Sequence, residues 1–265
     1  MNFFFGIKNN LISSNITIPR FQNNGYHNEK YSVYDAMPKD GKWSINKTIC
    51  QSDKNFFYID FSKFDKKQIF FLATELQVNN FIMSKQNILS NLNNFTNTSC
   101  KEFRSNLRIS INKKGFSSYQ SEYPIEMTRK KGSILSPLSS LLNSNSEQNL
   151  LFFKNIYFEP IFEKSKLYIV DMLNRKIIDE FEVSTNETNE IEIKKEFIKD
   201  SNYFFTEKTL GIPLFVSIKN DHLSFEHTHP PHLYLLNHNR FNKVSELKQE
   251  VRNIINLYNK ETNGI

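Results

Sequence analysis

Short apolar runs separated by polar segments follow one another at regular intervals along the second half of the chain, as in a protein built of short β-strands. From residue 150 onward the apolar runs are short and recur at intervals of roughly 8–12 residues, the spacing of an antiparallel sandwich or barrel. The predicted strands lie at about 150–158, 166–172, 176–183, 189–193, 202–207, 213–219 and 222–229, with a short one at 232–236. Residues 173–175 and 220–221 are expected to turn two hairpins, the second of them tight.

The first half of the chain shows the same pattern less regularly. β-Branched and aromatic residues predict strands at 31–34, 55–60, 68–74 and 103–111, and an extended segment at 15–19. Residues 38–43 are expected to form a turn-rich connection, and residues 84–100, rich in Asn and Ser, a loop. In the strand at 103–111 the apolar positions alternate with Arg104 and Arg108, which predicts a buried face and a basic outer face.

Between residues 132 and 149 the density of Ser and Asn rises and the strand pattern stops, apart from a short helical turn expected near 137–142. This change predicts a linker at 132–149 between an N-terminal β domain at 1–131 and a C-terminal sandwich or barrel at 150–265. The chain closes with a predicted helix behind a candidate Asn242 cap. The residues on its apolar face are Val244, Leu247, Val251, Ile254, Ile255 and Tyr258. The expected fold is therefore all-β, an antiparallel sandwich or barrel in two parts, with one C-terminal amphipathic α-helix covering the sheet.

Glycine is scarce, and this scarcity narrows the functional classes. The 265 residues include only 7 glycines, and no two of them lie within five residues of each other. The glycine-rich signatures of dinucleotide-binding folds, P-loop NTPases and elbow-type serine hydrolases are therefore all absent. The formal net charge of +6 is spread over short lysine runs without a basic stripe, so a nucleic-acid partner is not expected. Aromatic residues, 25 Phe and 11 Tyr, supply most of the bulk for a core.

The two cysteines, Cys50 and Cys100, form no C-x-x-C pair, which excludes a cysteine zinc site or a thioredoxin-type motif. They are expected either to form one disulfide in an oxidising compartment or to remain two thiols. No apolar run approaches the ~20 residues needed to span a bilayer. The N-terminal residues lack the pattern of a secretory signal, so the default expectation is a cytoplasmic protein.

Histidine is concentrated in one stretch near the C-terminus. Five of the six histidines fall between His222 and His238. On an extended strand His227 and His229 project from the same face, about 6.6 Å apart along it. The two prolines after His229 end or bend the strand, so that His232 could return as a third ligand. Three such groups could hold one divalent ion, Fe, Mn or Zn.

The H-x-H spacing of His227 and His229 resembles in part the metal-binding strand of cupins. The glycines that flank the cupin motif are missing, and no Glu follows at the expected position downstream. Glu226 precedes the pair and faces the opposite side of a regular strand, together with His222. We therefore do not assign the chain to that family, and Glu226 is only a candidate general base. The alternative is that the histidines end an edge strand and bind nothing.

A second candidate site is polar and aromatic. Tyr119, Gln120, Glu122 and Tyr123 follow one another closely, a composition that suits a carbohydrate because rings stack on sugar faces while amides and carboxylates bind hydroxyls. Arg104 and Arg108, on the preceding strand, could bind an anion.

Three hypotheses about function follow from these features. The first is a ligand-binding β-sandwich protein that takes a small molecule or carbohydrate at the histidine strand and the tyrosine segment. The second is a cupin-like mononuclear metal enzyme that uses His227, His229 and His232. The third is a structural or assembly protein without a site. Whether the protein is an enzyme is left open by the sequence.

Overall fold

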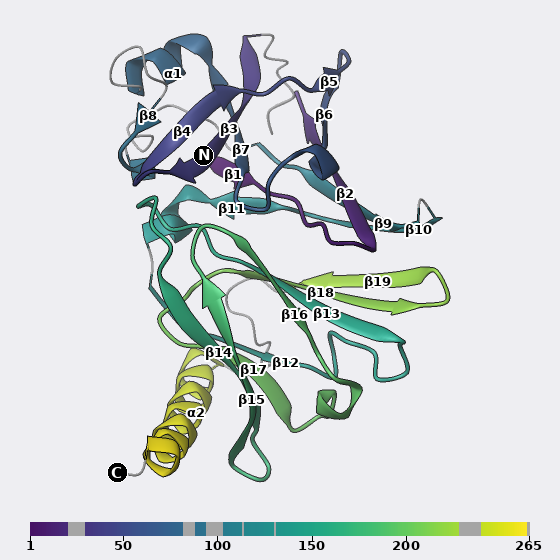
Figure 1. Cartoon of the computed structure of the whole chain (residues 1–265), viewed down its shortest axis with the longest axis vertical. Coiled ribbons are helices and arrows are strands. Elements are labelled where there is room, and N and C mark those ends of the chain that lie inside the picture. The colour runs from purple at the N-terminus through teal and green to yellow at the C-terminus, as the bar shows by residue number, and fades with distance from the viewer. Residues whose placement is uncertain are drawn as a thin grey trace.

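The computed structural model describes residues 1–20, 30–81, 88–93, 103–112, 114–129, 131–227 and 240–263. These residues form four antiparallel β-sheets and a long C-terminal helix (Figure 1). The predicted class, an all-β antiparallel sandwich with one C-terminal helix, is confirmed. No helix in the described part of the chain has both the length and the apolar character needed to cross a bilayer.

The N-terminal half forms two sheets. Sheet 1 runs in the order β11 (Glu122–Pro124), β1 (Asn2–Phe4), β7 (Ile69–Thr74), β3 (Tyr31–Lys39), β4 (Lys42–Lys47) and β8 (Ile88–Leu89). Sheet 2 runs in the order β10 (Lys114–Tyr119), β9 (Asn106–Ile111), β2 (Ile12–Pro19), β6 (Phe56–Asp60) and β5 (Gln51–Ser52). Short helices join some of these strands, namely η1 (Phe61–Lys63), α1 (Glu75–Phe81) and η3 (Ile125–Arg129).

The C-terminal half forms the other two sheets. Sheet 3 runs in the order β16 (Thr188–Glu192), β13 (Gln148–Lys154), β18 (Ile212–Lys219) and β19 (His222–His227). Sheet 4 runs in the order β12 (Ile134–Pro137), β17 (Asn202–Thr206), β14 (Lys164–Asp171) and β15 (Lys176–Ser184), and η4 (Lys195–Phe197) precedes β17. Both predicted hairpins form, β14 with β15 and β18 with β19. The second turns through Asn220 and Asp221, whose positive φ angles of 48° and 63° match a tight two-residue turn.

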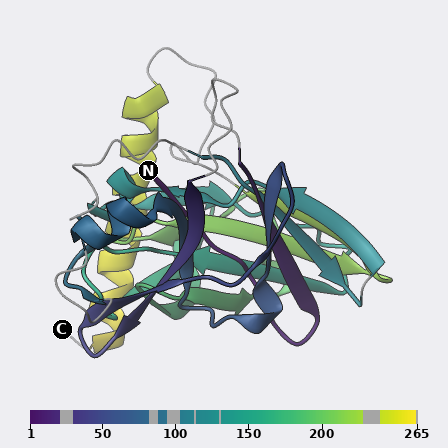
Figure 2. The ribbon, with the colours of Figure 1, turned by 90° about the horizontal axis from the view of Figure 1, so that it is seen from above.

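Sheet 3 is the central layer of the molecule, because its inner strands β13 and β18 are buried on both faces. In β13, Leu150 and Phe152 belong to the core shared with the N-terminal sheets, whereas Leu151 and Phe153 belong to the core shared with sheet 4. Burial on both faces explains why the strand is a continuous apolar run and does not alternate. On the far side of sheet 4 lies α2 (Arg240–Asn263), at the end of the molecule remote from sheets 1 and 2 (Figure 1). Seen from above, α2 runs along one side of the molecule (Figure 2).

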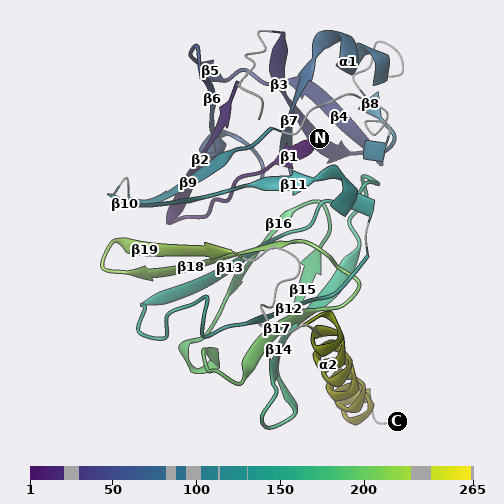
Figure 3. The ribbon, with the colours of Figure 1, turned by 180° about the vertical axis from the view of Figure 1, so that it is seen from behind.

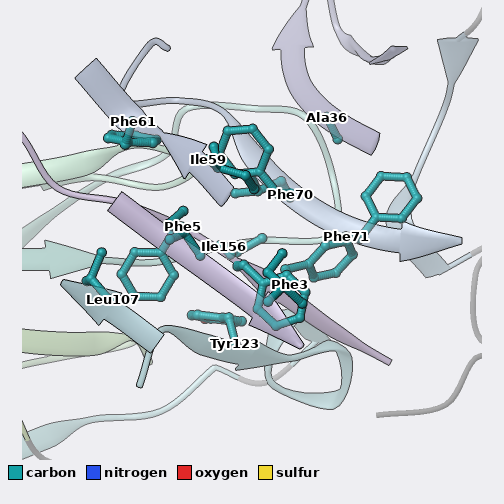
Figure 4. Close-up of a cluster of buried hydrophobic side chains, with 14 of the residues drawn as sticks. Phe3, Phe5, Ala36, Ile59, Phe61, Phe70, Phe71, Leu107, Tyr123 and Ile156 are labelled. Carbon is teal, nitrogen blue, oxygen red and sulfur yellow. The ribbon is translucent and has the colours of Figure 1, made fainter. Parts of the chain in front are cut away.

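The largest core cluster lies between the N-terminal sheets and sheet 3, and it is rich in aromatic rings (Figure 4). Phe3 meets Phe71 edge to face with ring centroids 6.1 Å apart, the geometry that aromatic pairs prefer. Tyr123 and Ile156 lie in the same cluster although they come from different halves of the chain. Gly6 is needed there, because a Cβ at this position would lie 2.2 Å from the Phe61 ring.

Several local predictions were wrong. The turn predicted within residues 38–43 is present at Asp40 and Gly41, with φ 49° and 69°, but the rest of this connection was predicted wrongly, because its residues belong to the hairpin of β3 and β4. The loop predicted at 84–100 contains the short strand β8, and α1 had not been predicted. Asn242 lies inside α2, so it cannot be the cap.

The stretch predicted as a linker is partly built into the C-terminal half. β12 pairs with β17, and Leu138 and Leu142 are buried in the core between sheets 3 and 4. The amide groups of Leu141 and Leu142 both donate to the Leu138 carbonyl, and the bond from Leu142 closes the single helical turn expected near 137–142. The division into domains at 1–131 and 150–265 stays a prediction.

Candidate functional site

The histidine strand β19 is an edge strand of sheet 3 and follows the predicted alternation. Leu223, Phe225 and His227 turn inward, whereas His222, Ser224 and Glu226 are exposed. His227 is only 9% exposed. Its ring directly contacts that of Tyr119 at the end of β10, with the planes tilted by 50°. Thus β10 and β19, the edge strands of two different sheets, lie side by side (Figures 1 and 3).

The predicted metal set is only partly within the described residues. His229 and His232 lie outside them, so their distance from His227 stays untested. Among the residues that the structure does describe, no three His, Cys, Asp or Glu side chains are placed to hold a metal ion. The candidate base Glu226 is on the face of β19 opposite His227. The metal-enzyme hypothesis therefore gains no support. Cys50 is a free thiol whose pKa is raised by burial, and Cys100 lies outside the described residues.

The four residues of the tyrosine segment do not converge on one site. Tyr119 is half-buried between sheets 2 and 3, where it also meets Phe225 edge to face, and Gln120 is exposed. Glu122 is buried and accepts a hydrogen bond of 2.7 Å from the Ser105 amide. Burial raises the pKa of the Glu122 carboxyl, against the lowering effect of that hydrogen bond and of Arg104.

Tyr123 is fully buried in the core drawn in Figure 4, and its hydroxyl donates to the Leu210 carbonyl at 3.3 Å. Burial raises the pKa of this phenol. Tyr123 therefore couples the two halves of the chain and does not face solvent. Of the two predicted arginines, Arg104 is exposed and lies near Glu122.

Arg108 has the surroundings of a binding residue. It is exposed on the outer face of sheet 2, and its guanidinium carbon lies 3.8 Å from the centre of the Phe116 ring. This cation–π contact holds the guanidinium over the sheet and leaves its N–H groups available. Phe116 itself is 55% exposed, so an apolar ring lies beside the charge at the surface.

Beside Arg108 the outer face of sheet 2 contains a hollow of about 650 Å³. Its described lining residues are Asn15, Thr17, Gln51, Tyr58, Asn106 and Arg108. All six side chains can form hydrogen bonds, and none of them carries a carboxylate. They converge because the strand register places them in neighbouring positions: Thr17 pairs with both Tyr58 and Asn106, and Asn15 pairs with Arg108.

One wall of the hollow is fixed in place by its own hydrogen bonds. The Tyr58 hydroxyl donates to the Asp53 carboxylate at 2.7 Å. The same carboxylate accepts from the backbone amides of Asn55 and Phe56. These hydrogen bonds, of which the one from the Tyr58 hydroxyl has the largest effect, hold the pKa of Asp53 below its usual value. The same bond raises the pKa of Tyr58. The phenol ring therefore keeps one orientation, which lowers the entropy lost when a ligand binds.

Sequence reasoning missed five of the six lining residues, although a signal was present. In β2 the apolar residues Ile12, Ile16 and Ile18 alternate with polar outward positions, and β9 alternates in the same way.

Comparison of the chain with protein-family models, with curated proteins and with solved structures found no match.

Proposed function

We propose that the protein binds carbohydrate in the hollow on the outer face of sheet 2. The observation that carries this proposal is the lining of the hollow, which consists of three amides, one hydroxyl, one phenol and one guanidinium. A planar amide or guanidinium presents paired hydrogen-bonding groups, whose spacing suits two neighbouring hydroxyls of a sugar. The exposed Phe116 ring beside Arg108 offers an apolar face to the C–H groups of a pyranose.

The size and polarity of the hollow favour a glycan over other ligands. Its volume of about 650 Å³ lies within the range of about 300–1,000 Å³ that is typical of ligand sites. Such sites for drug-like molecules are mostly lined by apolar side chains, whereas this lining is polar, so an apolar ligand would gain little from entering it. The single cationic side chain, Arg108, is compatible with either a neutral or an acidic sugar.

The first prediction concerns Arg108. We expect Arg108→Ala to weaken glycan binding at least about tenfold, because a hydrogen bond to a charged group contributes about 1.5–3 kcal/mol. The measurement is a glycan array with the full chain, followed by titration calorimetry of the best glycan against the wild type and the variant. Asn15→Ala, an exposed position paired with Arg108, should weaken the same glycan by a smaller factor.

Arg104→Ala is the matched control, because Arg104 is an exposed arginine close in sequence that does not line the hollow. It should leave the affinity unchanged. The proposal would be contradicted by a blank array at high protein concentration, or by equal affinities of the wild type and Arg108→Ala. Loss of binding in Arg104→Ala alone would place the site elsewhere.

A further inference from the structure

A second cavity lies in the C-terminal half, far along the chain from the hollow on sheet 2. It has a volume of about 280 Å³ and lies among β14, the segment that follows β13 and the loop that follows β17. We propose that this cavity binds a small hydroxyl-rich molecule that carries an anionic group, of the sugar phosphate or sugar acid class. The volume is slightly below the range of about 300–1,000 Å³ found for drug-sized ligands, which suits a ligand of the size of one sugar unit.

The inner part of the cavity is built from polar side chains that are held rigidly. Ser165 and Thr209 join their hydroxyls in a hydrogen bond of 2.5 Å. Thr185 accepts from the Glu163 amide at 2.9 Å and donates to the Ile161 carbonyl at 2.7 Å. These hydroxyl oxygens retain acceptor capacity for a further donor. A ligand that donates several hydrogen bonds would therefore meet a preformed set of acceptors.

Asn155 supplies the observation that points most directly to a ligand. Its side-chain amide nitrogen donates to the Leu210 carbonyl, which fixes the orientation of the amide. The oxygen of the same amide is buried and has no hydrogen-bond partner among the described residues. A buried acceptor without a donor destabilises the folded protein. Because Asn155 lines the cavity, a hydroxyl group of a bound molecule could supply the missing donor.

The exposed edge of the cavity is charged. Its ionisable members are Lys131, Glu163, Lys164, Lys166, Glu207 and Lys208. Five of the six are held in ion pairs, since Lys131 pairs with Glu163, Lys164 with Glu182, Lys166 with Glu180, and Glu207 with Arg252.

Lys208 is the exception. It forms no ion pair with any residue that the structure describes, and it stands exposed on the loop after β17. The remaining charge at the mouth of the cavity is thus a single ammonium group, which favours an anionic group on the ligand. Tyr157 and Tyr168 also line the cavity, and the centre of the Tyr157 ring lies 5.4 Å from the Lys131 ammonium.

Lys208 also offers a clean substitution. Its φ angle is +63°, in the left-handed region, where Asn is far better tolerated than most residues. Lys208→Asn therefore removes the charge without straining the loop. The matched control is Lys199→Asn, which removes an exposed lysine near the opposite end of β17.

The test measures binding of four probes to the full chain at constant ionic strength by titration calorimetry. We expect glucose 6-phosphate or glucuronate to bind at least tenfold more tightly than both glucose and inorganic phosphate. The first of the two anionic sugars tests a phosphate and the second a carboxylate, so their ranking identifies the anionic group. Lys208→Asn should weaken the better probe at least fivefold, and Lys199→Asn should leave its affinity unchanged.

Three results would overturn the proposal. The first is the absence of binding of both anionic sugars at 10 mM, and the second is that the better anionic sugar binds no more tightly than inorganic phosphate or glucose. The third is equal affinity of the wild type and Lys208→Asn for that sugar. Arg108→Ala, which alters the other hollow, should not change the affinity for these probes. A glycan that binds through Arg108 while all four probes fail would refute this site alone and leave the proposed function standing.

Discussion

Replacing Phe152 by alanine should lower the free energy of unfolding by about 3–5 kcal/mol, because it removes a buried aromatic ring from a close-packed core. Phe152 is 1% exposed, and it lies on the face of sheet 3 that packs against the N-terminal sheets. The cavity left behind would therefore open between the two halves of the chain.

We expect the midpoint of urea unfolding to shift to the same extent in both halves of the chain. Trp43, the single tryptophan, lies in β4 of sheet 1, and its indole nitrogen donates to the Phe158 carbonyl at 3.0 Å. Urea unfolding should be followed by Trp43 fluorescence, which reports on the N-terminal half, and by far-UV circular dichroism, which reports on all four sheets. Because the core is shared, Phe152→Ala should move both transitions to the same lower midpoint.

Phe162→Ala serves as the control, because Phe162 is 44% exposed and its loss should change the free energy of unfolding little. A fluorescence transition that stays in place while the dichroism transition moves would show that the halves unfold independently. That outcome would support the two predicted domains and contradict a single cooperative core.

The sequence predicts the elements of the C-terminal half well because each of them has a strong local pattern. β14 contains a continuous apolar run at 167–170, whereas Phe181 and Val183 of β15 alternate with acidic residues. The turn between the two strands is short. In β18 and β19 the Asn220–Asp221 pair is a typical two-residue turn, and the inward and outward residues of β19 alternate as predicted. Asp40–Gly41 carries the same signal, so the hairpin of β3 and β4 could also have been predicted.

The candidate site could not be predicted, because local patterns do not determine which strands become neighbours. The hollow on sheet 2 combines side chains from β2, β5, β6 and β9. In the sequence these residues extend from Asn15 to Arg108, across most of the N-terminal half. The alternation within each strand predicts which of its residues face outward. Only the pairing of β2 with both β6 and β9 brings those outward residues together. The histidine stretch shows the converse. A high local density of one residue type gives no distances, and its first members already divide between the two faces of β19.

The second large effect on the free energy of unfolding is expected from replacing Lys154. This residue is fully buried at the end of β13. Its ammonium group donates to the Lys66 carbonyl at 3.0 Å and so ties sheet 3 to the segment before β7. Burial lowers the pKa of Lys154 to about 7; Lys66 adds to this lowering, whereas Glu187 and Asp65 oppose it. An unfolded chain keeps this amine near its ordinary pKa of about 10.4.

The direction of the pH dependence follows from proton binding. Between pH 7 and about 10 the unfolded chain holds a proton on Lys154 that the folded chain has lost, so the free energy of unfolding rises with pH. The slope contributed by one proton is at most about 1.4 kcal/mol per pH unit. Below pH 7 both states are protonated and this contribution levels off at its least favourable value.

Lys154→Met should remove this slope and raise the free energy of unfolding at pH 7 by about 2–3 kcal/mol, because the desolvation of the ammonium group exceeds the roughly 1 kcal/mol of one lost hydrogen bond. The Lys66 carbonyl would still accept from the backbone amide and hydroxyl of Thr188, at 3.2 and 3.3 Å. The measurement is urea unfolding of the wild type, Lys154→Met and the exposed control Lys176→Met at several pH values from 6 to 10. If Lys154→Met keeps the slope of the wild type, another group titrates in this range and Lys154 is charged in the folded protein.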